Sequence, residues 1–272
     1  MTTPELPLAN RDLADLPGHW LLARLGKRVL RPGGLELTTR LLSSARITDA
    51  DVAELGPGLG RTAKDIVALR PRTYVGVDDT AAATEAVRAV VAPVNGNVVV
   101  ADASETGLPD NSVDVVVGEA MLTMQGDKNK RAIVEEAFRV LRPGGRYAIH
   151  ELGLKPDHIS QDIKDDIRKA LARSIRVNAR PLTAAEWTQL LTEAGFEIAS
   201  VDYADMALLN PKRVIADEGF LGALKIVGNI IRHPSARKRV LGMRQVFQRH
   251  RTSLAAIAVV GVVPNSPDKV TR

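Results

Sequence analysis

A glycine-rich turn is the feature of the sequence that points most directly to chemistry. The run from Asp51 to Ala63 carries glycines at three alternate positions, Gly56, Gly58 and Gly60. Glycines permit backbone conformations with positive φ and let backbone N–H groups approach a ligand closely. A plain tight turn between a strand and a helix would look the same, so the turn by itself identifies no ligand.

Glu54, two residues before the first of these glycines, narrows the class of ligand. Turns that bind dinucleotides have the spacing G-x-G-x-x-G and meet a pyrophosphate, whereas the spacing here is G-x-G-x-G. A carboxylate at this point would repel a pyrophosphate and would suit a ligand that carries an ammonium group.

Three further carboxylates follow apolar runs in the same way. Asp78 stands where a side chain can accept hydrogen bonds from both hydroxyls of a ribose. Asp102, beside Ala103, can accept from the amino group of an adenine. Glu119, beside Ala120, falls where ligands bind in an open α/β sheet. Each could be a solvated helix cap, but four in succession predict one site along one edge of a sheet.

A parallel sheet is needed to bring these side chains together. From Asp51 onward short apolar runs alternate with helix-length segments, which is typical of βαβ units. We expect an α/β protein with a doubly wound, seven-stranded, mostly parallel sheet. The expected strands are 51–55, 73–77, 98–101, 113–117, 146–151, 196–203 and 255–263. The expected helices are 19–30, 35–45, 61–69, 81–90, 128–141, 159–177 and one capped by Thr183 that runs to 194.

The chain is expected to form a single domain of four parts. Residues 1–48 would make an N-terminal helical lid, and residues 49–204 the core. Residues 205–252 would form a basic helical insert, and residues 253–264 the last strand. The lid would pack over the mouth of the ligand site.

At these residues the sequence resembles the class I S-adenosylmethionine-dependent methyltransferases. The run 54–60 resembles their first motif, Asp78 their second acidic position, and 102–103 their adenine contact. The stretches 108–116 and 138–146 are similar to segments of the subgroup that includes the ubiquinone and menaquinone methyltransferases. In the first stretch, Asp110 and Val113 replace two phenylalanines of that subgroup; neither position is expected to touch the cofactor.

The resemblance implies an enzyme that moves a methyl group from S-adenosylmethionine to oxygen, carbon or nitrogen of a small, apolar or lipophilic acceptor. The turn 56–60 would pass under the methionine part, and Glu54 would orient the amino end. Asp78 would hold the ribose, and the pair 102–103 the adenine. Glu119 and Ala120 would lie on the methionine side near the sulfonium. A binding module without catalysis and a nucleic-acid methyltransferase are the alternatives.

Candidates for the acceptor side follow two of the expected strands. His150 and Glu151 end the strand 146–151, and a histidine there could take a proton from a hydroxyl or phenol. Packed strand residues are the alternative, and alternation along a strand lets only one of the two point inward. Met121, Leu122 and Met124 suit the wall of an apolar pocket, or the core.

The expected lid offers a second set of candidates. Backbone amides at Gly33 and Gly34 could meet the cofactor carboxylate, with Arg31 as its charged partner. A plain turn between two helices is the alternative. His19 and Trp20 could line the lid or pack in the core.

Composition limits the compartment and the chemistry. The chain has no cysteine, which excludes disulfides and cysteine-ligated zinc, and we expect no metal site. The first twenty residues lack the basic and apolar regions of a secretory signal, and the longest apolar run has ten residues. We therefore expect a cytoplasmic protein.

The net charge of +5 is unevenly spread. Residues 210–251 hold ten Lys or Arg against Asp217 and Glu218, a net charge of +8, which leaves −3 for the rest. This segment, apolar over 220–231 and basic over 232–251, could cap the pocket or form the face of a homodimer. It could also lie on an anionic membrane as an amphipathic helix, which would make the protein membrane-peripheral. Nucleic acid is not expected as a partner, because Phe247 is the only interleaved aromatic residue.

Overall fold

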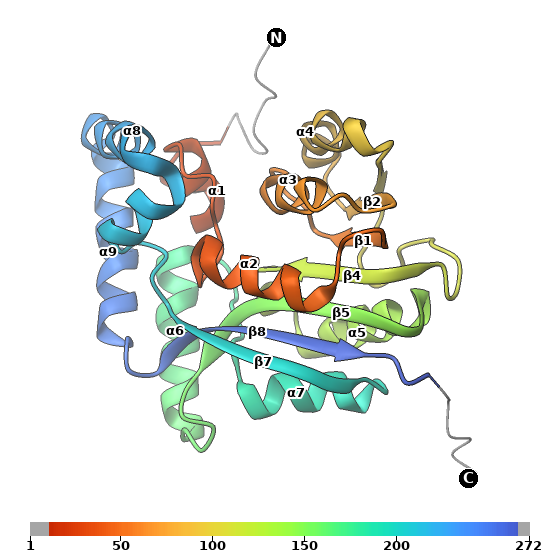
Figure 1. Cartoon of the computed structure of the whole chain (residues 1–272). Coiled ribbons are helices and arrows are strands. Elements are labelled where there is room, and N and C mark those ends of the chain that lie inside the picture. The colour runs from red at the N-terminus through yellow and green to blue at the C-terminus, as the bar shows by residue number, and fades with distance from the viewer. Residues whose placement is uncertain (1–10, 266–272) are drawn as a thin grey trace.

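A twisted β-sheet forms the centre of the molecule. The computed structural model describes residues 11–265 (Figure 1). The strands lie in the order β3-β2-β1-β4-β5-β8-β7, and a two-residue strand, β6 (Leu182–Thr183), pairs with β5 beside this path. Their bounds are β1 Asp51–Leu55, β2 Thr73–Asp78, β3 Asn97–Val100, β4 Val113–Glu119, β5 Leu141–Leu154, β7 Glu197–Asp205 and β8 Leu254–Val262.

The direction of the strands fixes where a ligand can bind. β1 pairs in parallel with β2 on one side and with β4 on the other. The chain order therefore reverses at β1, and the carboxyl ends of β1 and β4 flank a topological switch point. β8 runs antiparallel between β5 and β7. The expected doubly wound, mostly parallel sheet is confirmed, with the short β6 as an eighth strand.

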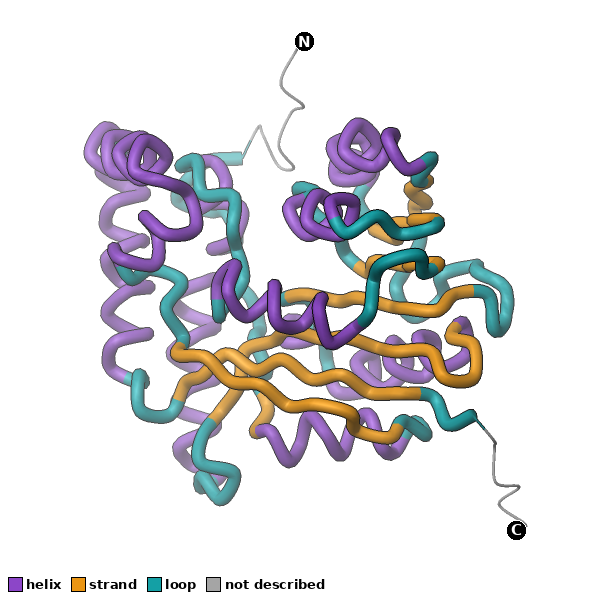
Figure 2. The backbone as a smooth tube through the Cα atoms, in the orientation of Figure 1, coloured by secondary structure: helices purple, strands orange, loops and turns teal. Residues whose placement is uncertain are grey.

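Helices cover both faces of the sheet. α2 (Gly34–Ala45), α3 (Arg61–Ala68) and α4 (Ala81–Val91) pack with the sheet in one core cluster. α5 (Asp127–Val140) and α7 (Ala184–Glu193) pack in a second cluster on the other face. Figure 2 shows these two helical layers with the strands between them. The short 3₁₀ turns η1 (Ala92–Val94) and η2 (Leu122–Met124) complete the connections.

Four further helices gather at one end of the sheet. These are α1 (Gly18–Arg24), α6 (Gln161–Ile175), α8 (Pro211–Arg232) and α9 (Pro234–Arg249). Three of them, α1, α6 and α9, share a third core cluster with Leu152 of β5 and Leu254 of β8. Figure 1 shows this helical end beside the tips of the central strands.

Most expected elements agree with the structure to within a few residues. Thr183 and Glu186 form the capping box that the sequence suggests at the start of α7. The expected helix 19–30 is wrong in its end, because α1 stops at Arg24. Gly26 follows at φ 104°, a conformation that ends the helix before the chain reaches Pro32, Gly33 and Gly34, the helix-breaking run on which the predicted end at residue 30 was based. The first ten residues of the expected lid lie outside the described residues.

The described residues include no helix that is long and apolar enough to cross a bilayer.

Candidate active site

A cavity of about 470 Å³ lies at the carboxyl ends of β1, β2 and β4. Its wall includes the four carboxylates that the sequence places at strand ends, Glu54, Asp78, Asp102 and Glu119. The volume falls in the range of small-molecule sites, roughly 300–1,000 Å³. The structure therefore brings residues that are far apart in the sequence to one site.

The glycine turn between β1 and α3 brings Gly56 and Gly58 to the cavity wall, whereas Gly60 lies outside that wall, next to Val87 and Val90 of α4. Gly56, Gly58 and Gly60 all have positive φ, at 65°, 53° and 72°. The Gly56 N–H donates to the Val77 carbonyl (2.8 Å). The Gly58 N–H donates to Asp78 Oδ2 (3.1 Å). The turn is thus tied to β2, and its shape favours residues without a Cβ.

Asp78 and Asp102 differ in burial and in the direction in which their pKa values are shifted. Asp78 is buried and accepts from the Gly58 and Thr80 amides, and burial raises its pKa. Asp102 is exposed, and the hydroxyl and amide of Ser104 lower its pKa. Ala103 lines the cavity beside it. Both carboxylates have oxygens available for hydroxyl or amino donors.

Glu54 is a buried carboxyl group that forms no ion pair within residues 11–265, although the charge of Arg31 acts on it from further away. It is 2% exposed, and Tyr74 donates its hydroxyl to Glu54 Oε2 (2.7 Å). Burial raises the pKa of Glu54 to about 8, against the smaller opposite effect of the Tyr74 hydrogen bond. A cationic ligand in the cavity would favour the ionised form.

Glu119 joins three segments of the chain. Its Oε1 accepts from the Thr38 hydroxyl of α2 and from His150 Nδ1 (2.8 Å) of β5. Its Oε2 accepts from the Thr62 hydroxyl of α3. Burial opposes ionisation, but the Arg31 guanidinium and the His150 hydrogen bond outweigh it and hold the pKa of Glu119 at about 2. Glu119 is therefore charged and already occupied by protein donors.

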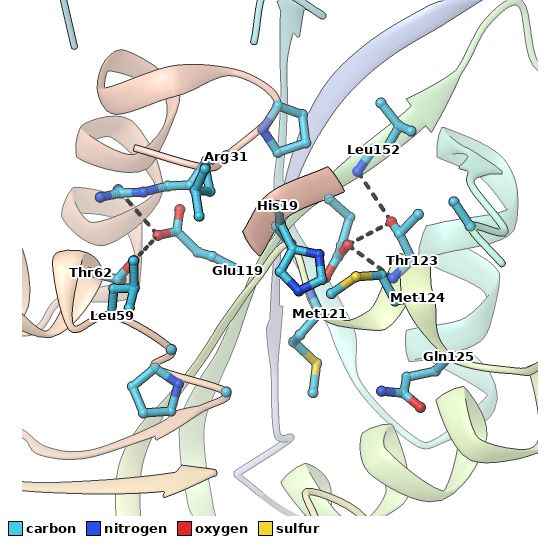
Figure 3. A pocket seen from close by; sticks show the side chains of 18 of the residues that line it. His19, Arg31, Leu59, Thr62, Glu119, Met121, Thr123, Met124, Gln125 and Leu152 are labelled. Atoms are coloured by element: carbon cyan, nitrogen blue, oxygen red, sulfur yellow. Dashed lines mark hydrogen bonds and ion pairs between the residues drawn. The ribbon is translucent and has the colours of Figure 1, made fainter. Parts of the chain in front are cut away.

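Arg31 carries unused hydrogen-bonding capacity into the cavity. Its Nη2 pairs with Asp65 (3.0 Å), and its Nη1 lies 3.2 Å from Glu119 Oε2. Nη1 is buried and makes no hydrogen bond of good geometry among the described residues. Figure 3 shows Arg31 and Thr62 directed at Glu119. A carboxylate on a ligand would satisfy Nη1.

The expectation for Gly33 and Gly34 is wrong. Neither residue is part of the cavity wall. The Gly33 amide donates to His150 Nε2 (3.0 Å), and the Gly34 amide donates to the Arg31 carbonyl. Gly34 has φ 67°, and a Cβ there would lie 2.8 Å from an oxygen of Asp217. Both glycines serve close packing at the start of α2.

The expectation of His150 as a base is also corrected. His150 is fully buried and is absent from the cavity wall. Its Nε2 accepts from the Gly33 amide, so its proton lies on Nδ1, which donates to Glu119. With both nitrogens occupied, His150 positions Glu119 and the start of α2.

Glu151 lines the cavity but is used to hold its wall. Its two oxygens accept from the Met121, Leu122 and Thr123 amides and from the Thr123 hydroxyl. Burial raises the pKa of this carboxyl group, and the hydrogen bonds from Thr123 oppose the rise. Glu151 therefore fixes the turn after β4. Ala120, at φ 55° in that turn, lines the cavity.

The other half of the cavity is apolar. His19 and Trp20 of α1 line it, as do Met121 and Met124, while Leu122 lies in the core. Burial lowers the pKa of His19 to about 4, so its ring is neutral at physiological pH. Figure 3 shows His19, Met121 and Met124 side by side, across the cavity from Arg31.

Residues from the far end of the chain complete this apolar half. They come from α6, from the segment before α8 and from α9: Leu171, Ile175, Met206, Leu208, Met243 and Phe247. The sequence predicted a cap for the segment 205–252 but assigned α6 to the core, and it named Phe247 only as an aromatic residue of the insert, not as part of a cavity wall. The apolar side of the segment 161–175 could have indicated a buried helix face. Which segments pack against that face cannot be known without the fold.

Comparison with known proteins agrees with this geometry. The family described as "Methyltransferase domain" matches residues 53–149, a range that contains the glycine turn and all four carboxylates. An uncharacterized protein of Haemophilus influenzae is 36% identical over 253 residues, which cover 90% of this chain and 97% of that protein. A Mycolicibacterium smegmatis protein named "Probable S-adenosylmethionine-dependent methyltransferase" is 36% identical over 159 residues, 56% of this chain and 54% of that one.

Solved structures share the fold. An S-adenosylmethionine-dependent methyltransferase of Thiobacillus denitrificans, in complex with S-adenosylhomocysteine, aligns with a TM-score of 0.65 at 16% identity. The alignment covers 92% of this chain and 99% of that one. Phosphoethanolamine N-methyltransferase 2 of Haemonchus contortus aligns with a TM-score of 0.63 at 16% identity, over 89% and 56% of the two chains.

The fold, the site and the matched family together define the class of the protein: it is an enzyme, a methyltransferase. The chain belongs to the same family as the Haemophilus influenzae protein, and its residues 53–149 match the family described as "Methyltransferase domain". Its cofactor is S-adenosylmethionine. The cavity fits that molecule, because in the described part of the chain the buried Glu54 carboxyl forms no ion pair and the buried Arg31 Nη1 makes no hydrogen bond.

Proposed function

We propose that the enzyme transfers the methyl group of S-adenosylmethionine to a small, apolar acceptor held under α1, α6 and α9. One observation carries this proposal: a single cavity has a charged half at the strand ends and an apolar half under the helical end. The likeness of 108–116 and 138–146 to the ubiquinone and menaquinone subgroup supports a lipophilic acceptor.

The charged half suits the cofactor. Arg31 Nη1 would meet its carboxylate, and Glu54 its ammonium group. Asp78 would hold the ribose hydroxyls, and Asp102 with Ala103 the adenine edge. Glu119 would act indirectly, because it holds Arg31 and Thr62 in place from β4. The cofactor supplies a methyl group activated by a positive sulfur.

The apolar half suits an acceptor. Displacement at the methyl group requires that a nucleophile be aligned with it and that water be kept out. Met121 and Met124 adapt their shape to varied ligands, and Leu171 and Ile175 of α6 add to the same apolar wall. His19 is neutral, so it would accept a hydrogen bond from an acceptor hydroxyl or amine and orient the lone pair.

The alternatives receive less support from this cavity. A cofactor-binding module without catalysis has no use for an apolar chamber beside the cofactor half. A nucleic-acid methyltransferase would need a basic groove that leads to the sulfur. The residues that line the apolar half from α1, α6 and α9 include no Lys or Arg.

A tritium-labelled methyl group on S-adenosylmethionine tests the proposal. The enzyme is incubated with the apolar small-molecule extract of bacterial cells and, separately, with cellular nucleic acid. We expect label in the organic phase of the first reaction and none in the nucleic acid. Label confined to nucleic acid, or label in neither fraction, would contradict the proposal.

A substitution that fills the apolar half of the cavity tests whether the acceptor binds there. Leu208→Trp adds bulk to the apolar half from a loop, and we expect at least about tenfold slower transfer with unchanged affinity for S-adenosylhomocysteine. Leu209→Trp is the matched control, since Leu209 is next in the loop but outside this cavity wall. Equal transfer rates for the two variants would overturn the assignment of the apolar half.

A further inference from the structure

Exposed apolar side chains are concentrated on two helices of the molecule. Eleven large hydrophobic residues are exposed in the described part of the chain. Seven of them belong to α8 and α9: Ile215, Phe220, Leu221, Leu224, Val227, Ile231 and Leu241. Proteins that stay in water expose such residues mostly singly, and a contiguous group marks an interaction surface.

The group on α8 forms a regular stripe. Residues 220, 224, 227 and 231 are spaced by four, three and four positions, which places them on one side of a helix. Phe220 is 66% exposed and Ile231 is 65% exposed, and the two residues between them are about half exposed. Leu221, beside Phe220, is 80% exposed. The stripe therefore faces outward along the second part of α8.

The opposite side of α8 is bound to the protein. Ala223 and Ile226 are buried, and Asn229 Nδ2 donates to the Leu25 carbonyl (3.0 Å). The helix is thus held by its inner side, which leaves the stripe available to a partner. Figure 1 shows α8 and α9 at the outer edge of the helical end.

The charge around the stripe has a single sign. Residues 219–251 contain eight Lys or Arg and no Asp or Glu. Lys225 and Arg232 are exposed on α8, and Arg237 and Lys238 are exposed at the start of α9. These four residues and the stripe are called the insert face below.

The acidic residues of α8 point the other way. Glu218 accepts from the Arg28 and Val29 amides (both 2.8 Å) and lies 3.5 Å from Lys27 Nζ. Asp217 accepts from the Leu35 amide (3.1 Å). Gly219, at φ 74°, kinks α8 directly after them. The kink therefore separates the part of α8 that holds the two anchoring acids from the cationic insert face.

We propose that the insert face binds the surface of an anionic lipid bilayer. An apolar stripe flanked by Lys and Arg, without acids, can place its side chains among acyl chains while the cations meet lipid phosphates. A second copy of the chain is a poorer partner, because a symmetric contact would set two cationic surfaces against each other.

The insert face adjoins the helix that walls the cavity. Met243 and Phe247 of α9 line the cavity, whereas Leu241 and Arg244 of the same helix are exposed. A bilayer bound at the insert face would thus lie against the wall of the apolar half. This arrangement suits an acceptor drawn from a membrane, although the lipid binding itself does not depend on the proposed function.

Vesicle flotation tests the proposal. The full chain is mixed with vesicles of phosphatidylcholine alone or of phosphatidylcholine with about 30% phosphatidylglycerol. We expect at least about tenfold tighter binding to the anionic vesicles, weakened when NaCl is raised from about 0.1 to 0.5 M. Binding to neither kind of vesicle, or equal binding to both, would overturn it.

Two variants separate the insert face from other surfaces. Leu221→Glu with Leu224→Glu should weaken binding at least about tenfold, and Arg237→Gln with Lys238→Gln about 25-fold, or about fivefold per residue. Ile163→Glu, at a 46% exposed residue of α6, is the matched control and should change nothing. Unaltered affinity for S-adenosylhomocysteine checks that each variant is folded.

Two further results would contradict the proposal. In the first, the variants bind anionic vesicles as tightly as the wild type does. In the second, the wild type does not bind lipid but forms a dimer, and Leu221→Glu with Leu224→Glu dissociates that dimer. The second result would assign the stripe to an interface between copies of the chain.

Discussion

Glu119 and Glu54, two buried carboxyl groups of the site, differ in their pKa values and in their hydrogen-bond partners. Glu119 has four protein partners and a pKa of about 2. Glu54 has one neutral partner and a pKa of about 8. Since both side chains are almost completely buried, the difference between the two pKa values comes from the nearby charges and donors. Glu119 therefore links α2, α3 and β5, whereas Glu54 is suited to a cationic ligand.

Glu54 should make cofactor affinity depend on pH. Below pH 8 the group is protonated in the free protein, so binding of a cationic ligand to its ionised form releases a proton. The affinity for S-adenosylmethionine should therefore rise from about pH 6 to about pH 7.5, by up to about tenfold per pH unit. Glu54→Gln removes the titrating group and should flatten this rise. Calorimetry across pH measures both, and a flat wild-type profile would contradict this assignment.

Glu119 should instead control the stability of the fold. Its pKa falls from 4.5 to about 2 on folding, so its contribution is fully present above pH 4.5 and is lost as the pH falls towards 2. Glu119→Gln should lower the free energy of unfolding by about 3 kcal/mol at pH 7, because Arg31 loses a buried partner. Urea denaturation at pH 7 and pH 3 checks this. An equal deficit at both pH values would show that Glu119 does not act through its charge.

The sequence placed the four carboxylates at one edge of the sheet, where the structure has them in one cavity wall, but it did not predict that His150 lies outside that wall. The carboxylates were found because each directly follows an apolar run, and parallel strands bring such positions to one edge. The ring nitrogen Nε2 of His150 accepts from the Gly33 amide, 117 residues away. Such a contact depends on how α2 packs on β5, which a local pattern does not contain.

At the scale of elements, most strands and helices could be predicted from the spacing of apolar residues and from the residues that cap or break helices. β1 was predicted at its observed bounds, and α2 within one residue, since apolar runs and helix caps are local signals. The end of α1 was misplaced because Gly26 stops the helix well before the stronger Pro-Gly-Gly signal. β6 was missed because a two-residue strand has no periodicity.

The glycine turn yields a prediction for the element that supports the cofactor. A Cβ on Gly58 would meet no atom closer than 3.9 Å, so Gly58→Ala costs only the positive φ, about 1–2 kcal/mol of stability. The added methyl group would stand over the cavity, so affinity for S-adenosylhomocysteine should fall at least about tenfold. Thermal unfolding and calorimetry measure the two effects.

Gly107→Ala is the matched control for this turn. Gly107 has φ 72°, and a Cβ there would meet nothing within 4 Å, but the residue lies outside the cavity wall. The variant should lose a similar amount of stability and keep its affinity. If both variants lose affinity equally, the turn does not contact the cofactor.

At the scale of the whole molecule, two halves of one cavity come from different parts of the chain. The charged half is built by residues 31–120, which are local to the parallel strands and could be predicted from sequence. The apolar half needs α1, α6 and α9 to meet at one end of the sheet. These helices are far apart in the chain and come together only by tertiary packing. The sequence therefore indicated a cap but could not show which residues line the cavity.

The uneven charge also belongs to this scale. The basic residues of 219–251 lie on the outer side of the helical end, while the acids of the site lie at the strand tips. The protein thus presents separate regions to a cationic cofactor and to an anionic surface. This separation lets the cofactor site and the insert face be tested independently.

Calorimetry with the purified full-length chain tests the central claim most directly. S-adenosylmethionine and S-adenosylhomocysteine are titrated into the wild type, into Asp78→Ala, and into Asp162→Ala, an exposed acid on α6, as the control. The account predicts saturable binding of both ligands to the wild type, with affinity unchanged in Asp162→Ala. Binding to Asp78→Ala should be at least about tenfold weaker, because a hydrogen bond to a charged group is lost. The absence of heat for both ligands, or equal affinities for all three proteins, would contradict it.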